Sequence, residues 1–230
     1  MEFVTLRNGV RMPMLGYGVY QVRPEECERC VLDALAVGYR ALEDLYEAGK
    51  VRAIGISNFY PDRMVDIASF ARIRPMVNQV EVHPLHQQTE AKEWLDKYGI
   101  QMEAWAPFGE GRGGLFENPV LARIGTKYGK TPAQVMLRWH LQQGVVVIPK
   151  STHIERMREN LNVFDFTLTT EDMAAIAALD QKRSAFFSHQ DPAMVEWFVK
   201  MVEERKHQHD ASREKKTGEF PFFSPFHHRN

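Results

Sequence analysis

Residues 145–156, with the sequence VVVIPKSTHIER, decide the fold class of this chain. The four apolar β-branched residues at 145–148 predict a strand that is buried on both faces, as in a parallel sheet covered by helices. Thr152 and Glu155 have the spacing of a capping box, so a helix is expected to open there and to run towards Leu161. A buried strand that leads directly into a capped helix is typical of α/β proteins.

The same alternation of apolar runs and helical patterns continues on both sides of this stretch. In the segment that Pro61 opens, for example, Met64 and Ala68 recur at helical spacing. The expected strands are 51–57, 77–83, 101–106 and 145–148, and the expected helices are 61–71, 90–98, 119–128, 131–144, 152–161 and 169–179. Strands that alternate with helices in this way predict a parallel sheet with helical crossovers.

The first fifty residues fit this pattern less well. A hairpin with Asn8-Gly9 as a type I′ turn is expected at the start of the chain. A strand over 14–20 and a helix over 24–37 follow. A further helical segment, 41–48, then comes without a strand between the two helices, which a regular strand and helix alternation does not allow.

We expect one α/β domain over residues 1–190, a C-terminal helix over 191–202 and a disordered tail over 203–230. The tail carries mixed charges and too little apolar surface to order a chain. It ends in an aromatic, proline-punctuated segment, Phe220 to Phe226, for which docking on a groove is the alternative to an unstructured end.

The composition of the 230 residues is that of an ordinary globular protein, with 44% hydrophobic and 26% charged residues. Lys and Arg total 29 against 30 Asp and Glu, so no overall basic field recruits nucleic acid or an acidic membrane surface. No run reaches the roughly 18 apolar residues of a membrane span. The N-terminus lacks the apolar core of a secretory signal, and two cysteines cannot form a disulfide framework. We therefore expect a cytoplasmic protein without a nucleic-acid or membrane partner.

A candidate anion site follows the strand at 145–148. Lys150, Ser151 and Arg156 come at the strand end and in the first turns of the expected helix. Backbone N–H groups and the helix dipole already favour an anion at such a place. Two positive charges and a hydroxyl donor therefore predict a phosphate site, and the alternative is a surface helix start with two solvated cations.

A second candidate site has Ser57 and Asn58 at the end of the strand 51–57 and Gln79 within the strand 77–83. Ser57, Asn58 and Gln79 are uncharged side chains that donate and accept hydrogen bonds, which suits a carboxamide. In a barrel, ligands bind at the C-terminal ends of the strands. Trp105, which ends the third strand, offers a flat indole for stacking on an aromatic ring. The alternatives are polar residues that cap their own loops and a tryptophan that fills the core.

Three further motifs give weaker signals. The run Gly109 to Gly114 matches G-x-G-x-x-G, but no acidic residue ends the next strand, so a lid loop is favoured over a dinucleotide fold. Cys27 and Cys30 share the apolar face of a helix and are expected to be buried thiols rather than a redox or metal site, and no zinc ligand spacing is found. His83 either acts as a base at a strand end or is satisfied by hydrogen bonds.

Taken in order, these segments resemble the aldo-keto reductase family over about residues 4–179. The matching motifs are Asn8 to Pro13, Leu15 to Gly18, Gly38 to Arg40, Gly49 to Phe59, Val77 to Glu81, and Ile148 to Ser151 followed by Arg156, Glu159 and Asn160. That family is a (βα)8 barrel that reduces aldehydes and ketones to alcohols with NADPH. The resemblance therefore implies this fold, this cofactor and a small carbonyl substrate.

The resemblance implies that NADP(H) is held at two places. At the nicotinamide end, the carboxamide would lie on Ser57, Asn58 and Gln79, and the ring would stack on Trp105. The residues at the other end are Lys150, Ser151 and Arg156 on the adenosine 2′-phosphate, with Glu159 and Asn160 on the adenine side.

The chain departs from the family pattern between Arg40 and Ala41, which are joined directly. In the family, the second strand with a catalytic Asp follows this point, and a catalytic Tyr, Lys and His come on later segments. A barrel of about 250 residues spends about 30 on each strand and helix, so roughly 75 residues, or strands two to four, are missing. We therefore expect an incomplete barrel with about five of eight strands, no assignable catalytic residue, and open sheet edges through which copies associate.

Three functional hypotheses remain open. In the first, the chain is an NADPH-dependent carbonyl reductase with weak activity, because a positioned acid is typically worth ~10²–10⁴ in rate. In the second, it binds NADPH without turnover. In the third, it is a deletion remnant without function. The sequence does not specify the substrate.

Overall fold

In a computed structural model of the chain, the described residues are 2–14, 39, 42–188, 191–194, 196–197 and 200–201. They belong to two units, residues 1–185 and 186–230. The predictions that lie outside the described residues are the strand beyond Met14, the helix over 24–37 with Cys27 and Cys30, the junction between Arg40 and Ala41, and the tail over 203–230.

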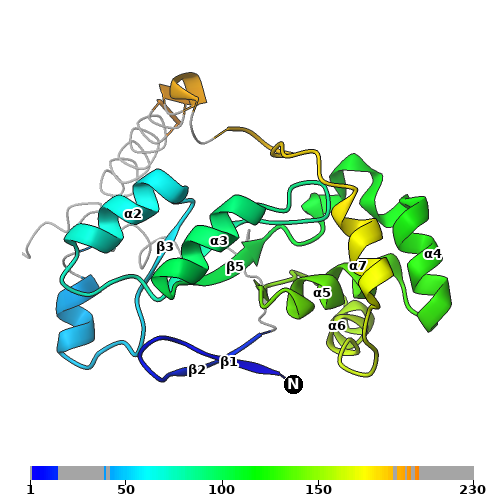
Figure 1. Cartoon of the computed structure of the whole chain (residues 1–230), viewed down its shortest axis with the longest axis horizontal. Coiled ribbons are helices and arrows are strands. Elements are labelled where there is room, and N and C mark those ends of the chain that lie inside the picture. Colours follow the sequence, from blue (N-terminus) through cyan, green and yellow to red (C-terminus); the bar gives the residue numbers. More distant parts are fainter. Residues whose placement is uncertain are drawn as a thin grey trace, which may run out of the picture. The chain divides into compact units, whose positions relative to one another are not determined.

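The larger unit is built on a four-stranded parallel sheet (Figure 1). Its strands, in spatial order, are β3 (Gly55–Ser57), β4 (Val77–Glu81), β5 (Gln101–Trp105) and β6 (Val146–Val147). The register places Ser57 opposite Gln79, and Gln79 opposite Glu103. Further along, Glu81 lies opposite Trp105. The predicted parallel α/β sheet is confirmed, although each strand is shorter than the apolar run that predicted it.

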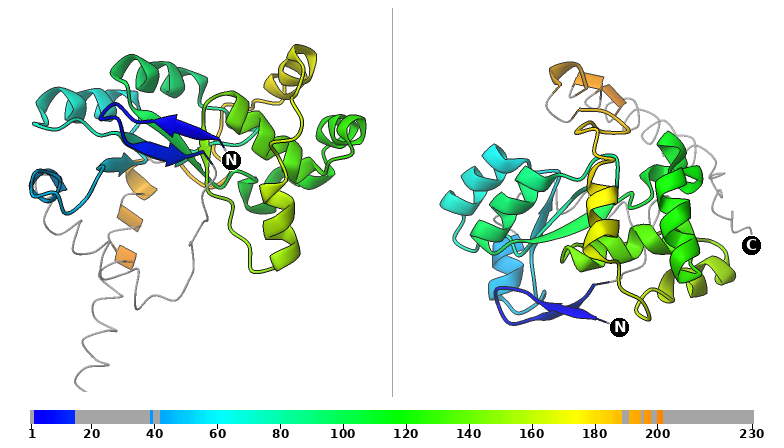
Figure 2. Two further views of the ribbon diagram at one scale, coloured as in Figure 1. Left: turned by 90° about the horizontal axis from the view of Figure 1, so that it is seen from below. Right: turned by 45° about the vertical axis from the view of Figure 1, so that its right-hand side comes forward.

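Helices make the crossovers that a parallel order requires. They are α2 (Pro61–Phe70), α3 (Thr89–Tyr98), α4 (Pro119–Tyr128), α5 (Pro132–Gln142), α6 (Ile154–Leu161) and α7 (Thr170–Ala177), with the 3₁₀ turns of η1 (Gly109–Glu117) before α4. In both Figure 1 and Figure 2, α2 and α3 lie side by side and α7 packs against α4. Residues 42–47 form a further helical segment.

Local signals set the starts of α4, α5 and α7. Asn118 accepts hydrogen bonds from two N–H groups in the first turn of α4. Thr131 and Gln134 form a complete capping box at α5. Thr169 and Asp172 form another at α7. Because these caps satisfy N–H groups that have no partner inside the helix, the three helices begin where the sequence predicts.

The start of α6 differs from the prediction. The helix begins at Ile154, and the residue before it, His153, makes no side-chain cap. The Ser151 hydroxyl instead accepts from the His153 N–H at 3.1 Å and donates to its carbonyl at 3.2 Å. This local turn moves the N-cap from the predicted Thr152 to His153, one residue later, so the capping box predicted at Thr152 is wrong.

The N-terminal hairpin is present, but its turn is not the predicted one. β1 (Phe3–Thr5) pairs antiparallel with β2 (Arg11–Pro13). A type I′ turn needs two residues with positive φ, whereas Gly9 has φ +80° and Asn8 does not have a positive φ. The Gly9 N–H bonds to the Leu6 carbonyl at 2.8 Å. The connection is therefore the three-residue kind, in which only the final glycine is left-handed.

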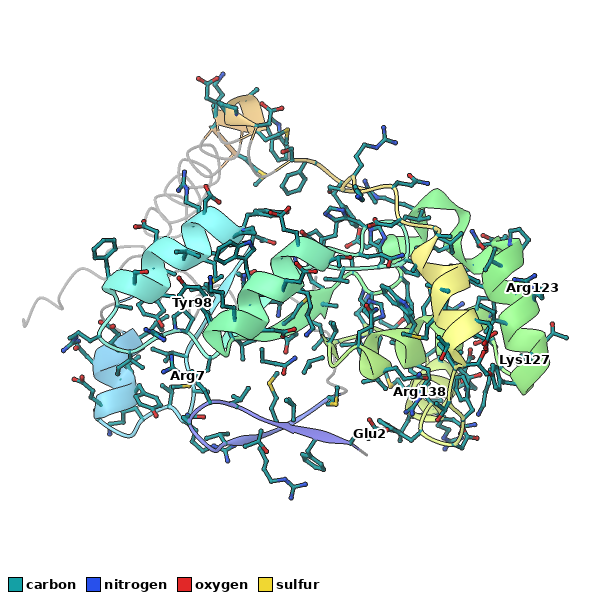
Figure 3. The ribbon with its side chains drawn as sticks, viewed as in Figure 1. Glu2, Arg7, Tyr98, Arg123, Lys127 and Arg138 are labelled. Atoms are coloured by element: carbon teal, nitrogen blue, oxygen red, sulfur yellow. The ribbon has the colours of Figure 1, made fainter. Side chains whose placement is uncertain are left out.

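The hairpin leads back to the sheet at β6. The Met14 carbonyl accepts from the Val147 N–H at 3.0 Å, so the chain at Met14 runs along the outer side of β6. Figure 3 shows Glu2 next to Arg138 of α5, and their ion pair measures 2.8 Å. At the opposite side of the sheet, β3 pairs only with β4 within the described ranges.

The hydrophobic core centres on α5. Every residue of this helix from 134 to 141 is buried, and Trp139 is the largest of the core side chains. His140 lies in the same core, where burial lowers its pKa to about 4, so its ring is neutral at neutral pH. The core therefore holds α5 along most of its length.

The second unit contains helical residues at 192–194, 196–197 and 200–201. Asp191 opens this segment, because its Oδ1 accepts from the Ala193 N–H at 3.0 Å. Among the described helices of the chain, none has the length and apolar character needed to cross a bilayer.

Candidate functional site

Four of the predicted site residues meet at the ends of β3 and β5 and, between these, in the middle of β4, and we call this group the amide edge. Its members are Ser57, Asn58, Gln79 and Trp105. The Ser57 hydroxyl donates to the Gln79 carbonyl at 3.0 Å, and the Asn58 N–H donates to the same carbonyl at 2.9 Å. The parallel register therefore brings together side chains that lie far apart in the sequence.

The side chain of Asn58 is oriented by Trp105. The indole Nε1 donates to Asn58 Oδ1 at 2.8 Å. Because an indole nitrogen only donates, Asn58 must turn its oxygen to Trp105. Its NH₂ group is left without a hydrogen-bond partner among the residues that the structure describes. Asn58 has φ +59°, a left-handed conformation that asparagine tolerates better than most residues.

The side chain of Gln79 is oriented by Glu103, a residue that the sequence analysis missed. Gln79 Nε2 donates to Glu103 Oε1 at 2.5 Å. Glu103 is 8% exposed; burial raises the pKa of its carboxyl group, and the bond from Gln79 lowers it in part. The signal that finds Glu103 is its spacing of two from Trp105, which places both side chains on one face of β5.

The other five predicted residues line one cavity of about 340 Å³, which we call the phosphate cavity. They are Lys150, Ser151, Arg156, Glu159 and Asn160. The rest of its wall, which the sequence analysis did not single out, consists of Phe108, Phe116, Thr131, Pro132 and Ala133. The end of β6, the first turns of α6 and the start of α5 thus face one space.

The phosphate cavity is lined by two cations, Lys150 and Arg156, and by one carboxylate, Glu159. Lys150 and Arg156 are exposed, and within the described part of the chain neither forms an ion pair. The N–H groups in the first turn of α6 lie at the same place, where the helix dipole also favours an anion. Ser151 is buried, and its hydroxyl already bonds to the backbone of His153.

Hydrogen bonds from α5 hold α6 and the wall of the phosphate cavity. Gln134 Nε2 donates to the carbonyls of Glu159 at 3.1 Å and Asn162 at 2.9 Å. The Thr131 hydroxyl donates to Glu159 Oε1 at 2.5 Å. Gln134 is buried, so these bonds are shielded from water. The Glu159 wall of the cavity is therefore fixed to α5, whose residues 134–141 are all buried.

The glycine-rich stretch borders the phosphate cavity through Phe108 and Phe116. Most of η1 has backbone angles outside the helical region. A Cβ on Gly113 would lie 2.5 Å from a methyl group of Leu85, so this glycine allows the loop to pack closely. Since α4 begins only at Pro119, no helix opens at the glycines as a dinucleotide fingerprint requires.

His83 lies outside the phosphate cavity, in a buried polar cluster. Its Nε2 lies 2.9 Å from Glu81 Oε1, and its Nδ1 has no partner among the described residues. Glu81 also accepts from the Ser184 hydroxyl at 2.5 Å and from the Ala185 N–H at 2.8 Å. Burial raises the pKa of Glu81, but the bonds from His83, Ser184 and Ala185 outweigh it and lower that pKa. The interpretation of His83 as a hydrogen-bonded residue is confirmed at one ring nitrogen.

Comparison with known proteins identifies a family and several relatives. The family model described as "Aldo/keto reductase family" matches residues 30–181. A 9,11-endoperoxide prostaglandin H2 reductase of Trypanosoma cruzi is 49% identical over 146 residues, 63% of this chain and 52% of its own. A glyoxal reductase of Bacillus subtilis is 50% identical over 143 residues, 62% of this chain and 51% of its own. The chain thus spans about half the length of the curated relatives it matches.

Solved structures are similar as well. An aldo-keto reductase from a deep-sea metagenome library has a TM-score of 0.74 and 28% identity, covering 82% of this chain and 98% of its own. An aldo-keto reductase of the silkworm Bombyx mori, complexed with NADPH, has a TM-score of 0.61 and 32% identity, covering 65% of this chain and 48% of its own. The family resemblance predicted from the motifs is therefore found in sequence and in structure.

Proposed function

The chain belongs to the aldo-keto reductase family, and we propose that it binds NADP(H) between the phosphate cavity and the amide edge. What supports this proposal is that the nine predicted residues form only two groups in space, each with the chemistry of one end of that cofactor. The proposed frame for both groups is an incomplete (βα)8 barrel with about five of its eight strands.

The phosphate cavity suits the 2′-phosphate of the adenosine. Lys150 and Arg156 supply positive charge and form no ion pair among the described residues, and the first turn of α6 adds N–H donors. Glu159 and Asn160 line the same cavity and would contact the adenine. A cofactor without the 2′-phosphate, such as NADH, would leave the two cations unused.

The amide edge suits the nicotinamide carboxamide. Asn58 presents an NH₂ donor and Gln79 a carbonyl acceptor, because Trp105 and Glu103 occupy their other ends. The indole of Trp105 would stack on the ring, and Ser57 would add its hydroxyl oxygen. These residues would orient the reacting face of the cofactor at the strand ends.

For the reaction, we propose reduction of small aldehydes or ketones, at a low rate. When bound, NADPH supplies the hydride. Reduction also needs a proton donor, and the family's catalytic Asp, Tyr, Lys and His lie in the segment that is missing between Arg40 and Ala41. A positioned acid is typically worth ~10²–10⁴ in rate, so turnover is expected to be that much slower than in a complete barrel.

NADPH binding without turnover is the second candidate function, and one observation favours it. Arg40 and Ala41 are adjacent in the sequence, so the segment that carries the family's catalytic residues is absent between them. The names of the two curated relatives indicate a dicarbonyl and an endoperoxide as their substrates. Assaying the chain with glyoxal and NADPH distinguishes slow turnover from none.

The binding proposal is tested with a double variant, Lys150→Ala and Arg156→Ala. Hydrogen bonds to charged groups contribute roughly 1.5–3 kcal/mol each, and solvent exposure reduces this, so NADPH affinity is expected to fall about 30-fold while NADH affinity changes by less than about threefold. Equal losses for the two cofactors would contradict the phosphate assignment.

A matched control removes two other exposed cations, Arg123→Ala and Arg158→Ala. Arg158 lies on the same helix as Arg156, and neither control residue lines the phosphate cavity. The control changes the net charge by the same amount, so it should leave the ratio of NADPH to NADH affinity unchanged.

A further inference from the structure

We infer that Glu103 and Trp105 preset the amide edge to accept a carboxamide, and that Glu103 makes it reject a carboxylate in the same place. The inference rests on the proposed function, because it concerns the nicotinamide end of the proposed site. It assigns Glu103 as a specificity-determining residue that acts by positioning Gln79.

The two orienting residues come from one strand. Glu103 and Trp105 are two apart in β5, so their side chains leave the same face of the sheet. The register puts Glu103 directly opposite Gln79 of β4, and the Trp105 indole reaches Asn58 just beyond β3. Each amide therefore has one fixed neighbour from β5.

The chemistry of these neighbours decides which way each amide turns. A carboxylate accepts hydrogen bonds, so Gln79 directs its NH₂ to Glu103 at 2.5 Å and keeps its carbonyl oxygen for a ligand. An indole donates, so Asn58 directs its oxygen to Trp105 at 2.8 Å and keeps its NH₂ for a ligand. Neither of these remaining groups has a partner within the described part of the chain.

The result is one donor and one acceptor side by side. A carboxamide matches this pair, because it has a carbonyl oxygen for Asn58 and an NH₂ group for Gln79. A carboxylate has two acceptors, so one of its oxygens would face the Gln79 oxygen without a proton between them. A polar group left unsatisfied in this way should weaken binding roughly ten- to a hundredfold.

Three ligands test the inference on the whole chain. NADP⁺ carries the carboxamide, nicotinic acid adenine dinucleotide phosphate carries a carboxylate at the same position, and 2′,5′-ADP lacks the nicotinamide end altogether. We expect NADP⁺ to bind at least about tenfold more tightly than the acid analogue. Equal affinity for the two dinucleotides would overturn the inference.

Variants of Glu103 separate orientation from charge. In Glu103→Gln, the new amide offers either a donor or an acceptor to Gln79, which is then able to turn and donate to a carboxylate. Glu103→Asp keeps the negative charge but is one methylene shorter, so it should not reach Gln79. We expect the preference for NADP⁺ to fall to about threefold or less in both variants.

Trp105→Phe is the matched control, because it keeps an aromatic ring and removes the indole N–H that donates to Asn58 Oδ1. Gln79 stays oriented by Glu103 in this variant, so the preference for the carboxamide should remain while both affinities fall modestly. If Glu103→Asp keeps the full preference and Glu103→Gln loses it, charge repulsion rather than orientation is responsible, and the inference is wrong.

Binding of 2′,5′-ADP keeps the two proposals apart. Unchanged 2′,5′-ADP affinity in every variant shows that the phosphate cavity and the fold are intact, so a changed preference belongs to the amide edge. If the unmodified chain does not bind 2′,5′-ADP, the proposed function fails, and the inference that rests on it fails for that separate reason.

Discussion

The phosphate cavity and the amide edge depend on parts of the fold that differ in how they are held. The phosphate cavity is fixed by hydrogen bonds to α5, the helix whose residues 134–141 are all buried. The amide edge includes the end of β3, a three-residue strand that pairs only with β4 within the described residues. The adenosine end of the site should therefore tolerate changes around β3, and the nicotinamide end should not.

Next to β3, the helical segment 42–47 is held by polar contacts of Glu43. Arg72 Nε lies 3.2 Å from Glu43 Oε2, and the Ile73 N–H donates to Glu43 Oε1 at 2.9 Å. The bond from Ile73, with that from Arg72, holds the pKa of Glu43 below its usual range. Nearby, Leu45 is 43% and Phe70 is 85% exposed. Polar contacts thus tie helical segment 42–47 to the chain between α2 and β4.

Breaking the anchor of the phosphate cavity should have the largest effect. Gln134→Ala removes the bonds to Glu159 in α6 and to Asn162 just after it, and half of the capping box of α5, which together cost about 3 kcal/mol of unfolding free energy. Affinity for 2′,5′-ADP should fall about tenfold, because α6 is no longer fixed against α5. Calorimetric titration measures this, and unchanged 2′,5′-ADP affinity with lowered stability would show that α6 does not need the anchor.

Replacing Asp172, which belongs to neither the phosphate cavity nor the amide edge, should have an intermediate effect on stability. Asp172 accepts from Lys127 at 2.8 Å, from the Tyr128 hydroxyl at 2.5 Å and from the Thr169 N–H at 3.1 Å. Burial alone would raise the pKa of Asp172, but these bonds outweigh it and lower the pKa from 3.8 to about 2. The lowered pKa corresponds to about 2 kcal/mol of stability.

The sign of this contribution sets its pH dependence. A carboxyl with a lowered pKa stabilises the fold above its ordinary pKa of 3.8, and the contribution is lost as the pH falls towards 2. Asp172→Asn should therefore lower the unfolding free energy by about 2 kcal/mol at neutral pH and by little near pH 2. Urea unfolding at both pH values measures the difference. An equal loss of unfolding free energy at both pH values would assign the effect to packing. Because Asp172 belongs to neither the phosphate cavity nor the amide edge, the variant should not change the ratio of NADPH to 2′,5′-ADP affinity.

The smallest expected effect on stability and affinity comes from replacing Glu43, near β3. Glu43→Gln keeps the shape but removes the charge that Arg72 and the Ile73 N–H recognise, at a cost of about 1 kcal/mol. NADPH affinity should fall about threefold while 2′,5′-ADP affinity stays constant. Asp44→Asn, at a 68% exposed partner of Arg72, is the control and should change neither. If Glu43→Gln lowered NADPH and 2′,5′-ADP affinity equally, the phosphate cavity and the amide edge would not differ in their dependence on β3.

The sequence predicts those features that depend on neighbouring residues. Asn118, Thr131 and Thr169 set the starts of α4, α5 and α7 by local caps, and these helices are where the sequence places them. The start of α6 was not predictable in this way, because the Ser151 hydroxyl competes for the backbone of His153. The turn at Gly9 is equally ambiguous, since an Asn-Gly pair fits more than one hairpin loop.

In the candidate site, too, the features set by neighbouring residues were predictable and those set by the pairing of strands were not. Lys150, Ser151 and Arg156 lie within seven residues, so their common place was predictable from a strand end and a helix start. The pairing of Glu103 with Gln79 depends on the register between β4 and β5, which neither segment specifies alone. Orientation of the amides therefore becomes visible only once the parallel sheet is assembled.

The melting temperature of the chain with saturating NADPH, with NADH and without ligand tests the central claim most directly. A ligand that binds only the folded state adds about 2.7 kcal/mol at about 100 times its dissociation constant, which a thermal melt resolves easily. We expect NADPH to raise the melting temperature clearly and by more than NADH does. A cooperative melt that NADPH does not shift, or one that both cofactors shift equally, would contradict the account.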